Sequence, residues 1–369
     1  MKAKVIENKN NEVITNFVEL ENKIKDIDYN NMSIKYMCSR EFECMCVDIS
    51  KLIDVTNIST QDIIDKINSE LEKGGEENRK KAFVILFIFA SKYRRNKILG
   101  GFELVSTFST YFADIPMYDF CYLLAKYSEY NNSASIKNII GEVKGLLTTE
   151  EFKDEIGVKN FYCELVATYY EHELEKRDDY EAQLELKNAY KTISLCIDLS
   201  KKKAYDKFYA NRGRILILLK KYDEGEREIR KALSTVNATD AESTTRVILF
   251  ENYLIQSSSI RYYDLNNEKY NELNKIKINN FKIITLMTTL LSFILGSINI
   301  FSTISEPFLM AMLLVAFLGL ILTLCGIILF GLGLVFKDNK KKYVIYDLIV
   351  LSIGIIFFTA ALCCLILIK

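Results

Sequence analysis

The chain has few residues that interrupt helices. It is also poor in histidine, the side chain that most often acts as an acid or base near neutral pH. Its 369 residues include two prolines, one histidine and no tryptophan. Pro116 is the only proline ahead of the apolar C-terminal part, so long helices can form there almost without interruption. The single histidine, His172, lies between Glu171 and Glu173, which favours a solvated position on a helix. Nothing in the sequence places it near a nucleophile or a metal cluster.

Short catalytic motifs are also missing. The chain has no G-x-x-x-x-G-K-[ST] phosphate loop, no G-x-G-x-x-G after a strand, no H-E-x-x-H and no G-x-S-x-G. Cys38, Cys44 and Cys46 lack the paired spacing of a zinc site, and no second cluster completes them, so buried thiols are expected. We therefore expect a protein that is not an enzyme, with no catalytic residue, no metal and no cofactor. A membrane enzyme built from scattered carboxylates is the remaining alternative.

An excess of positive charge is absent too. The chain has 48 basic and 48 acidic residues. Nucleic-acid-binding proteins need a clearly basic face to neutralise phosphates, so no nucleic-acid partner is expected. Abundant lysine, asparagine and isoleucine is typical of an AT-rich genome and favours a bacterial source.

The N-terminus lacks the pattern of a secretory signal. The first eleven residues are rich in lysine and asparagine, and residues 13–27 are amphipathic instead of continuously apolar. Six cysteines of the polar body have no regular paired spacing, which is typical of a reducing compartment. These are Cys38, Cys44, Cys46, Cys121, Cys163 and Cys196. The body is therefore expected in the cytoplasm.

Three long apolar runs follow the polar body. They cover residues 283–304, 308–336 and 343–368, and each exceeds the roughly 20 residues that a helix needs to cross about 30 Å of hydrocarbon. The connection between the second and third runs holds four lysines, whereas the turn between the first and second holds no basic residue. Short cationic loops stay in the cytoplasm, so the sequence predicts a multi-pass protein of the cell membrane with its C-terminus outside.

Apolar residues in the body recur at helical spacing, which predicts an all-α fold. Residues 13–27 form a first amphipathic helix, and residues 59–71 form another that begins with a capping-box-like Ser59 and Asp62 and stops at Gly74. Residues 34–53 are ambiguous and allow a short strand. The apolar segment 82–90 is too short to cross a membrane and is expected to be a buried core helix. Later helices are predicted at 98–112, 118–130, 134–147, 159–177, 184–202, 205–221 and 223–235, and one or two long helices at 244–280.

One helix pair is specific enough to suggest a family. The segment 205–237 reads YDKFYANRGRILILLKKYDEGEREIRKALSTVN. It resembles a tetratricopeptide repeat (TPR), in which two antiparallel helices pack through small residues within a period of about 34. Arg212 and Asn237 depart from the pattern, and the preceding pair matches only loosely. The resemblance implies a TPR-like helical solenoid, with an irregular helical bundle as the alternative, and its packing positions are Tyr209, Gly213, Leu216, Tyr222, Gly225, Ile229 and Ala232.

Two further groups of residues are candidate sites. Basic residues border the ends of the apolar segment 82–90, and a small phosphate-bearing ligand could use them, although solvated helix ends are the simpler interpretation. The ligand-binding candidates are Lys81, Lys92, Arg94, Arg95 and Lys97. In the second apolar run, Gly319, Gly326 and Gly333 recur every seven residues and make one groove for close helix packing, within one subunit or between subunits.

These patterns predict four regions: a mainly helical N-terminal part (1–78), a TPR-like domain (79–240), connecting helices (241–282) and a three-helix membrane domain (283–369). The membrane runs carry no charge near their centres, which disfavours ion-coupled transport. The order of parts is similar to that of bacterial membrane effectors. We expect a cytoplasmic sensor or interaction domain coupled to an oligomeric effector in the lipid bilayer, of the membrane-disrupting kind used in anti-phage defence (abortive infection). The alternative is a membrane-anchored TPR scaffold that recruits a protein partner for assembly or secretion.

Overall fold

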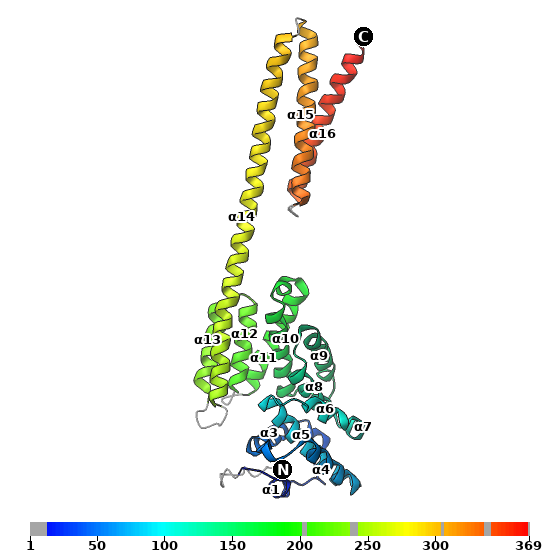
Figure 1. The fold of residues 1–369 in the computed structure, drawn as a ribbon, viewed down its shortest axis with the longest axis vertical. Helices are drawn as coiled ribbons and strands as arrows, with labels where there is room; N and C mark the ends of the chain where they lie inside the picture. Colours follow the sequence, from blue (N-terminus) through cyan, green and yellow to red (C-terminus); the bar gives the residue numbers. More distant parts are fainter. Residues whose placement is uncertain (1–12, 201–204, 237–242, 304–305, 336–340, 368–369) are drawn as a thin grey trace. The chain divides into compact units, whose positions relative to one another are not determined.

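The fold is all-α, as the sequence predicts. The computed structural model describes residues 13–200, 205–236, 243–303, 306–335 and 341–367, and its regular elements there are helices, with one isolated bridge between Ile14 and Ile53 (Figure 1). The first helices are α1 (Phe17–Ile24), α2 (Ile34–Met37), α3 (Arg40–Leu52), η1 (Val55–Asn57), α4 (Thr60–Glu72), α5 (Gly75–Asn96), α6 (Gly101–Thr107) and α7 (Ser109–Phe112). The next are α8 (Pro116–Glu129), α9 (Ser133–Leu146), α10 (Ile156–His172), η2 (Leu174–Asp178), α11 (Tyr180–Leu199), α12 (Asp206–Leu218) and α13 (Tyr222–Thr235). The last are α14 (Ser243–Thr303), α15 (Pro307–Val335) and α16 (Lys341–Leu367).

Local signals set several helix boundaries. The predicted capping box at the start of α4 is confirmed, because Ser59 and Asp62 each bond the other's backbone N–H. Gly74 follows that helix with φ of 69°, a left-handed conformation that glycine adopts without strain. The strand alternative for residues 34–53 is wrong, since α2 and α3 occupy nearly all of it. The helix predicted at 98–112 is broken near Phe108 into α6 and α7.

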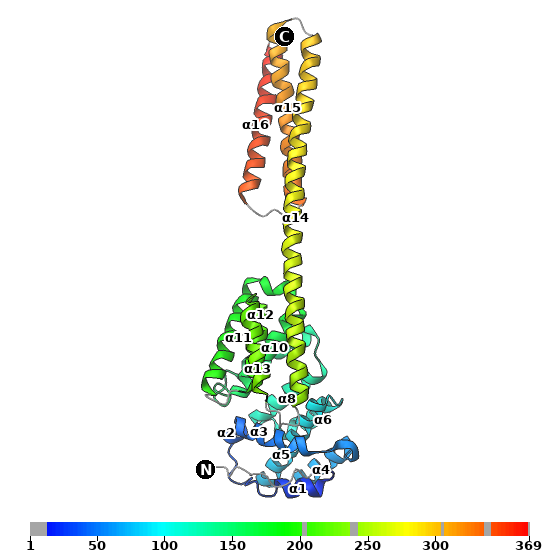
Figure 2. The same ribbon diagram turned by 90° about the vertical axis from the view of Figure 1, so that its left-hand side faces the viewer.

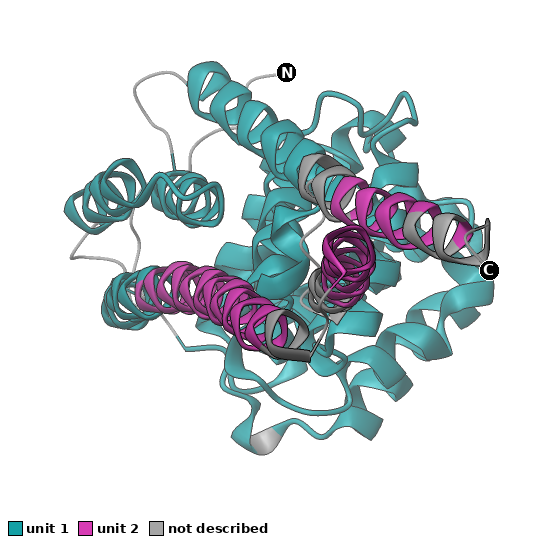
Figure 3. Cartoon of the chain, turned by 90° about the horizontal axis from the view of Figure 1, so that it is seen from above, with its two compact units in different colours: residues 1–261 teal, residues 262–369 magenta. Residues whose placement is uncertain are grey.

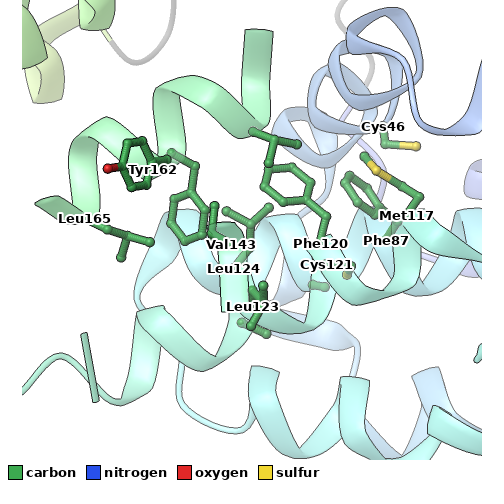
Figure 4. Packing of buried hydrophobic residues seen from close by; sticks show 14 of the residues in the cluster. Cys46, Phe87, Met117, Phe120, Cys121, Leu123, Leu124, Val143, Tyr162 and Leu165 are labelled. Carbon is green, nitrogen blue, oxygen red and sulfur yellow. The ribbon is translucent and has the colours of Figure 1, made fainter. Parts of the chain in front are cut away.

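Helix α5 forms the centre of the N-terminal core. Every side chain from Ala82 to Ala90 is buried, so the prediction of a buried core helix is confirmed. Helices α3, α4, α6 and α8 surround it. Figure 4 shows Phe87 of α5 grouped with Met117 and Phe120 of α8 in this core. A segment that is apolar on all its faces is stable in water only when other elements cover it.

Helices α8 to α13 form successive packed pairs. Helix α10 contacts α9, α11 and α12, and α12 packs along α13. The helix predicted at 159–177 ends earlier, at His172, and continues as the 3-10 turn η2. Packed neighbouring pairs are consistent with a helical repeat fold.

The chain divides into two compact units, residues 1–261 and 262–369 (Figure 3). The division falls within α14, an uninterrupted helix that begins in the first unit. In the second unit α15 and α16 run side by side (Figure 2). Two helices among the described residues are long and apolar enough to cross a membrane, within Ser243–Ile298 and Pro307–Leu324. Helix α16 contributes a shorter apolar segment, Leu348–Ala360, so the third of the three predicted spans is not established by length and composition.

Candidate functional site

A buried ion pair joins α10 to α12 in the first unit. The side chain of Arg214 on α12 is only 4% exposed, and that of Glu171 on α10 is 6% exposed. Nε of Arg214 donates to Oε1 of Glu171 over 2.8 Å, and Nη2 donates to Oε2 over 2.6 Å. Two parallel N–H···O bonds between a guanidinium and a carboxylate are the strongest and most directional form of such a pair.

Arg214 also donates hydrogen bonds to other side chains of the same two helices. Nη2 also donates to Oγ1 of Thr168 over 2.8 Å, and Nη1 donates to Oδ1 of Asn211 over 3.2 Å. Thr168 lies three residues before Glu171, and Asn211 lies three residues before Arg214, so each helix presents both of its polar groups on one face. Nδ2 of Asn211 in turn donates to Oδ1 of Asn160 over 3.0 Å. The polar network is therefore specified by helical spacing.

Two tyrosines extend this network to α14 and α8. The guanidinium carbon of Arg214 lies 4.5 Å from the ring centroid of Tyr253 on α14, within the range of a cation–π contact. The hydroxyl of Tyr127 on α8 lies 3.3 Å from Oγ1 of Thr168. We call these groups (Asn160, Thr168 and Glu171 of α10, Asn211 and Arg214 of α12, Tyr127 and Tyr253) the Arg214 network. It connects four helices through one buried charge.

The network keeps a defined charge state near neutral pH. Burial by itself lowers the pKa of Arg214, but the charge of Glu171 outweighs burial and raises that pKa well above its usual value. Burial raises the pKa of Tyr253 to about 12, even though the nearby Arg214 acts in the opposite direction. The guanidinium is therefore charged and the phenol neutral.

Further contacts hold the first part of α14 against the body. Oγ of Ser257 donates to Oε1 of Glu226 on α13 over 3.2 Å, and Nη1 of Arg261 donates to Oδ1 of Asp223 over the same distance. Phe250 of α14 is completely buried. These contacts attach α14 to the body over several helical turns.

The arrangement suits coupling better than chemistry. Arg214 and Glu171 neutralise each other, and a guanidinium that stays charged has no acceptor lone pair with which to act as a general base or nucleophile. A small recess lies elsewhere, among α3, α8 and α10, and is lined by Arg40, Glu43 and Glu155. Its cavity volume of about 10 Å³ is far below the range of roughly 300–1,000 Å³ typical of ligand sites. In the described ranges no three His, Cys, Asp or Glu side chains are grouped to hold a metal ion.

No protein-family model, curated protein or solved structure matches this chain. Its function must therefore be inferred from its own geometry.

The structure does not bring the five basic candidates together. Lys81 pairs with Glu70 at 3.2 Å and Glu21 at 3.4 Å. Lys92 lies eleven residues further along α5, about 16 Å at 1.5 Å per residue. Burial, and then the charge of Arg95, lowers the pKa of Lys92. Lys97 ends α5 in a left-handed conformation with φ of 54°.

Arg94 is half-buried near the end of α5, as is Arg95. Its charge acts on Glu43 of α3, whose pKa burial nevertheless raises. The basic residues thus belong to different surroundings, with Lys81 in an ion-pair group near the first helices and Arg94 beside Glu43. Binding of a phosphate-bearing ligand by all five together stays a prediction without a shared cavity to support it.

The repeat-packing residues do lie together, between α12 and α13. A Cβ atom added at Gly213 would lie 2.6 Å from the carbonyl oxygen of Gly225, and one at Gly225 would lie 2.7 Å from that of Gly213. The two backbones therefore touch where each glycine lacks a side chain. Ile229 fills the space beside Gly213. Leu216, Ile229 and Ala232 are buried, Tyr209 lies under Lys231, and Tyr222 lies under Arg261.

Two of the three glycines singled out in the second apolar run, Gly319 and Gly326, face the neighbouring helix of the same unit. A Cβ at Gly326 would lie 2.7 Å from Cα of Leu351, and one at Gly319 would overlap the backbone of Phe358. Gly354 of α16 approaches Thr323 of α15 in the same way. This geometry matches the interpretation of packing within one subunit. Gly333 is helical in α15, and its surroundings lie outside the described part of the chain.

Sequence reasoning missed the Arg214 network. In the sequence Glu171 stands out only as a neighbour of His172, because its partner Arg214 is 43 residues away. One signal was present: Asn211 and Arg214 come just before an apolar run of α12, Ile215 to Leu218, whose side chains are all buried. A charged residue inside an apolar helix needs a buried partner.

Proposed function

We propose that this chain is a membrane-bound sensor whose cytoplasmic helical domain controls an oligomeric transmembrane effector. The observation that carries the proposal is α14. One helix contains Tyr253, which contacts Arg214 in the body, and continues into a segment apolar enough to cross a membrane. No glycine or proline occurs between Ser243 and Leu295, so no helix breaker separates the two parts. A ligand or partner that shifts α10 against α12 would act on α14 directly.

The proposal includes three membrane spans, formed by the end of α14, α15 and α16. The body lies in the cytoplasm and the C-terminus outside, because the lysine-rich connection before α16 stays on the cytoplasmic side. The close approach of α15 and α16 through Gly319, Gly326 and Gly354 supports a tight hairpin of membrane helices. The effector is of the membrane-disrupting type expected in bacterial anti-phage defence, and it acts without catalysis.

The cytoplasmic domain is proposed to be a TPR-like solenoid. What supports this is the α12–α13 pair, in which Gly213 and Gly225 touch as small residues of a repeat do. The first part of α14 packs after this pair, as a further helix would in a stacked array. Such arrays recognise a partner or ligand and need no catalytic group.

Controlled expression in a bacterial host tests the proposal. High expression takes the place of the unknown trigger, because association between copies of the chain rises with their concentration. We expect loss of membrane potential and uptake of an impermeant dye with the unaltered chain. Gly326→Leu should abolish both, since the added side chain would overlap Leu351. Leu324→Phe is the matched control, because Leu324 lies on the same helix and is about half exposed.

The proposal fails if the unaltered chain reaches the membrane in quantity while the membrane potential stays normal. It also fails if Gly326→Leu and Leu324→Phe disrupt the membrane equally well. In that second case the α15–α16 hairpin has no part in the activity.

A second function, a membrane-anchored scaffold, is favoured by an exposed apolar stripe on α11. Tyr180, Leu184, Leu195 and Leu199 recur at helical intervals and are exposed. Such a stripe can recruit a protein partner. Replacing residues 283–369 with an unrelated three-span anchor separates the two functions. A scaffold keeps its partner and its activity, whereas an effector loses dye uptake.

A further inference from the structure

Three exposed lysines of α14 stand just before its apolar run. They are Lys275, Lys277 and Lys282, and the chain has no acidic residue between Glu272 and Glu306. Lys275 and Lys282 are seven residues apart and so lie on one side of the helix, whereas Lys277 lies about 200° around it from Lys275. The positive charges therefore surround α14 instead of forming a patch on one side. We call these three residues the α14 lysines.

A contact within the second unit gives the depth of these lysines relative to the apolar run. Phe293 stands in the middle of the run 283–304, and its ring stacks on that of Phe317 of α15 with centroids 6.3 Å apart. When the run crosses a bilayer, its middle lies about 15 Å from each edge of the hydrocarbon layer. Lys282 precedes Phe293 by eleven residues, about 16.5 Å at 1.5 Å per residue. Lys282 therefore lies at the edge of the hydrocarbon.

The other two α14 lysines lie further out, at about 24 and 27 Å from the middle of the run. The headgroup layer ends about 20–22 Å from the bilayer centre. The four-carbon side chain of a lysine can span the difference and place its ammonium among the phosphates. All three α14 lysines can thus reach the same headgroup layer.

The start of α16 is at the same end of the second unit. Phe293 lies ten residues before the end of α14, and Phe317 lies ten residues after the start of α15, so their contact makes the two helices an antiparallel pair. Val335 follows Phe317 by 18 residues, as Lys275 precedes Phe293 by 18, which puts both at one level. The lysine-rich segment that leads into α16 begins directly after Val335. Basic residues are therefore concentrated at one end of the unit.

We propose that the α14 lysines bind the phosphates of anionic phospholipids in the cytoplasmic leaflet. Anionic headgroups attract lysines that stand next to a membrane span, because the leaflet carries a negative surface potential. Phosphates surround a helix that enters a bilayer, so lysines on opposite sides of α14 can each meet one. A single soluble anion would need them on one side.

This inference rests on the proposed function, because it takes the apolar end of α14 as a membrane span with the body in the cytoplasm. It deepens that function by naming the class of lipid that the coupling helix contacts. The contacts lie on α14 between the Tyr253 contact with the body and the first span. Lipid charge would therefore act on the helix that the body has to move.

The absence of tryptophan from the chain allows a direct test. Phe281→Trp places a single indole beside Lys282, at a position that is 51% exposed. Phe308→Trp is the matched control, because Phe308 is 65% exposed at the opposite end of the unit, where Glu306 is the nearby charge in the sequence. The full chain is reconstituted in vesicles of phosphatidylcholine and phosphatidylglycerol, with bromine on the acyl chains of one lipid or the other. Bromine quenches indole fluorescence only at close range, so quenching reports which lipid lies beside the indole.

At equal mole fractions, brominated phosphatidylglycerol should quench Phe281→Trp at least about twofold more than brominated phosphatidylcholine does. The two lipids should quench Phe308→Trp equally. Salt at about 1 M should weaken the preference at Phe281→Trp, because it shortens the screening length to roughly 3 Å.

Substitution of the α14 lysines separates charge from packing. In the Phe281→Trp background, changing all three to Gln should abolish the preference, and changing all three to Arg should keep it, because Arg keeps the charge. Lys269→Gln is a further control. This exposed lysine lies about 9 Å further from the membrane than Lys275, so its loss should leave the preference unchanged.

Equal quenching of Phe281→Trp by the two lipids overturns the proposal. So does a preference that survives the three Gln substitutions, or one that is equally strong at Phe308→Trp. A preference abolished by excess soluble glycerol phosphate at constant ionic strength also overturns it, because the site would then bind a free phosphate.

Dye uptake in the bacterial host separates this inference from the proposed function. A preference for phosphatidylglycerol without dye uptake keeps the lipid contact and rejects the effector. Dye uptake with equal quenching by the two lipids rejects the lipid contact alone. Failure of both brominated lipids to quench Phe281→Trp rejects the first membrane span, and both proposals with it.

Discussion

Arg214 shows how a single buried charge can be tolerated in a helical core. Removing a guanidinium and a carboxylate from water is costly, and their attraction offsets this only when the geometry is good and the other donors are satisfied. Here Glu171 accepts two hydrogen bonds, Thr168 and Asn211 accept others, and Tyr253 covers the guanidinium. A well-packed apolar pair could be as stable. We infer that the charge serves to specify how α10, α12 and α14 meet.

Removing one partner of the Arg214–Glu171 pair should destabilise the fold much more than replacing both partners. Arg214→Met leaves the Glu171 carboxylate buried alone and should lower the free energy of unfolding by about 3–5 kcal/mol. The double variant Arg214→Met with Glu171→Met should recover much of this loss. Urea unfolding of the full chain in detergent, followed by circular dichroism, measures both.

Arg212→Met is the matched control for that experiment. Arg212 pairs with Glu228 at 2.6 Å at a more exposed position on the same helix, so its loss should cost about 1 kcal/mol or less. Equal effects of the two substitutions would mean that burial of the Arg214 pair has no special consequence.

The carboxylate of Glu70 should make the stability of the fold depend on pH. Its buried carboxylate accepts from Lys73 at 2.8 Å and contacts Lys66 and Lys81 at 3.1 and 3.2 Å. Burial raises its pKa, but hydrogen bonds from these lysines outweigh burial and lower the pKa to about 2. A carboxylate whose pKa is lower in the folded state stabilises the fold above its unfolded value near 4.5, and this contribution disappears as the pH falls toward 2.

Unfolding midpoints of the wild type and Glu70→Gln should therefore differ by a constant amount above about pH 5 and converge between pH 4.5 and 2. Thermal unfolding across this range provides the measurement. A difference that persists unchanged to pH 2 would show that Glu70 acts through packing instead of charge.

At the scale of elements, close helix pairs depend on missing side chains. Gly213 and Gly225 let α12 and α13 touch through their backbones, and Gly319, Gly326 and Gly354 do the same for α15 and α16. A helical glycine is otherwise unfavourable, because alanine loses less conformational freedom on folding. A glycine at a helix contact is therefore present because a larger side chain would not fit there.

Gly213→Ala should separate steric need from helix propensity. The added Cβ would lie 2.6 Å from both Gly225 O and Ile229 Cγ1, so we expect a loss of about 1–3 kcal/mol in the free energy of unfolding. Gly145→Ala in α9 is the control, since nothing lies within 4 Å of its added Cβ. That variant should gain up to about 1 kcal/mol. A gain at both positions would show that α12 and α13 can move apart freely.

At the scale of the whole molecule, α14 is the only described element shared by the two compact units. Its first turns contact the body, and its last turns belong to a candidate membrane span. A continuous helix transmits rotation and translation along its length, whereas a flexible linker does not. The proposed control of the effector therefore depends on helical continuity between residues 262 and 282.

Two insertions after Asn267 test that dependence. Gly-Gly-Ser should uncouple the units and change dye uptake at least severalfold, because it introduces flexible backbone. A seven-residue insertion that repeats the sequence of one heptad should preserve activity, since it rotates the helix by only about 20° from its original phase. Equal activity with both insertions would mean that the membrane helices act without the body.

Local patterns predicted part of this structure well. The all-α class, the capping box at Ser59 and the buried segment 82–90 follow from spacing over a few residues, and the structure confirms them. Residues 34–53 and 98–112 were less well predicted, because short helices such as α2 and α7 depend on their neighbours more than on their own sequence. The Arg214 network was missed because Tyr127, Glu171, Arg214 and Tyr253 are far apart in the chain.

The sequence by itself determined that the protein is helical, that apolar helices follow a polar body, and that no short catalytic motif is present. Helical periodicity and composition are local properties, so the chain displays them before it folds. Only the tertiary structure decided that Gly326 faces α16, that Lys81 pairs with Glu70 and Glu21, and that Arg214 reaches Glu171 and Tyr253. These contacts depend on which faces of the helices pack together, because a charge is buried and paired only in the packed core.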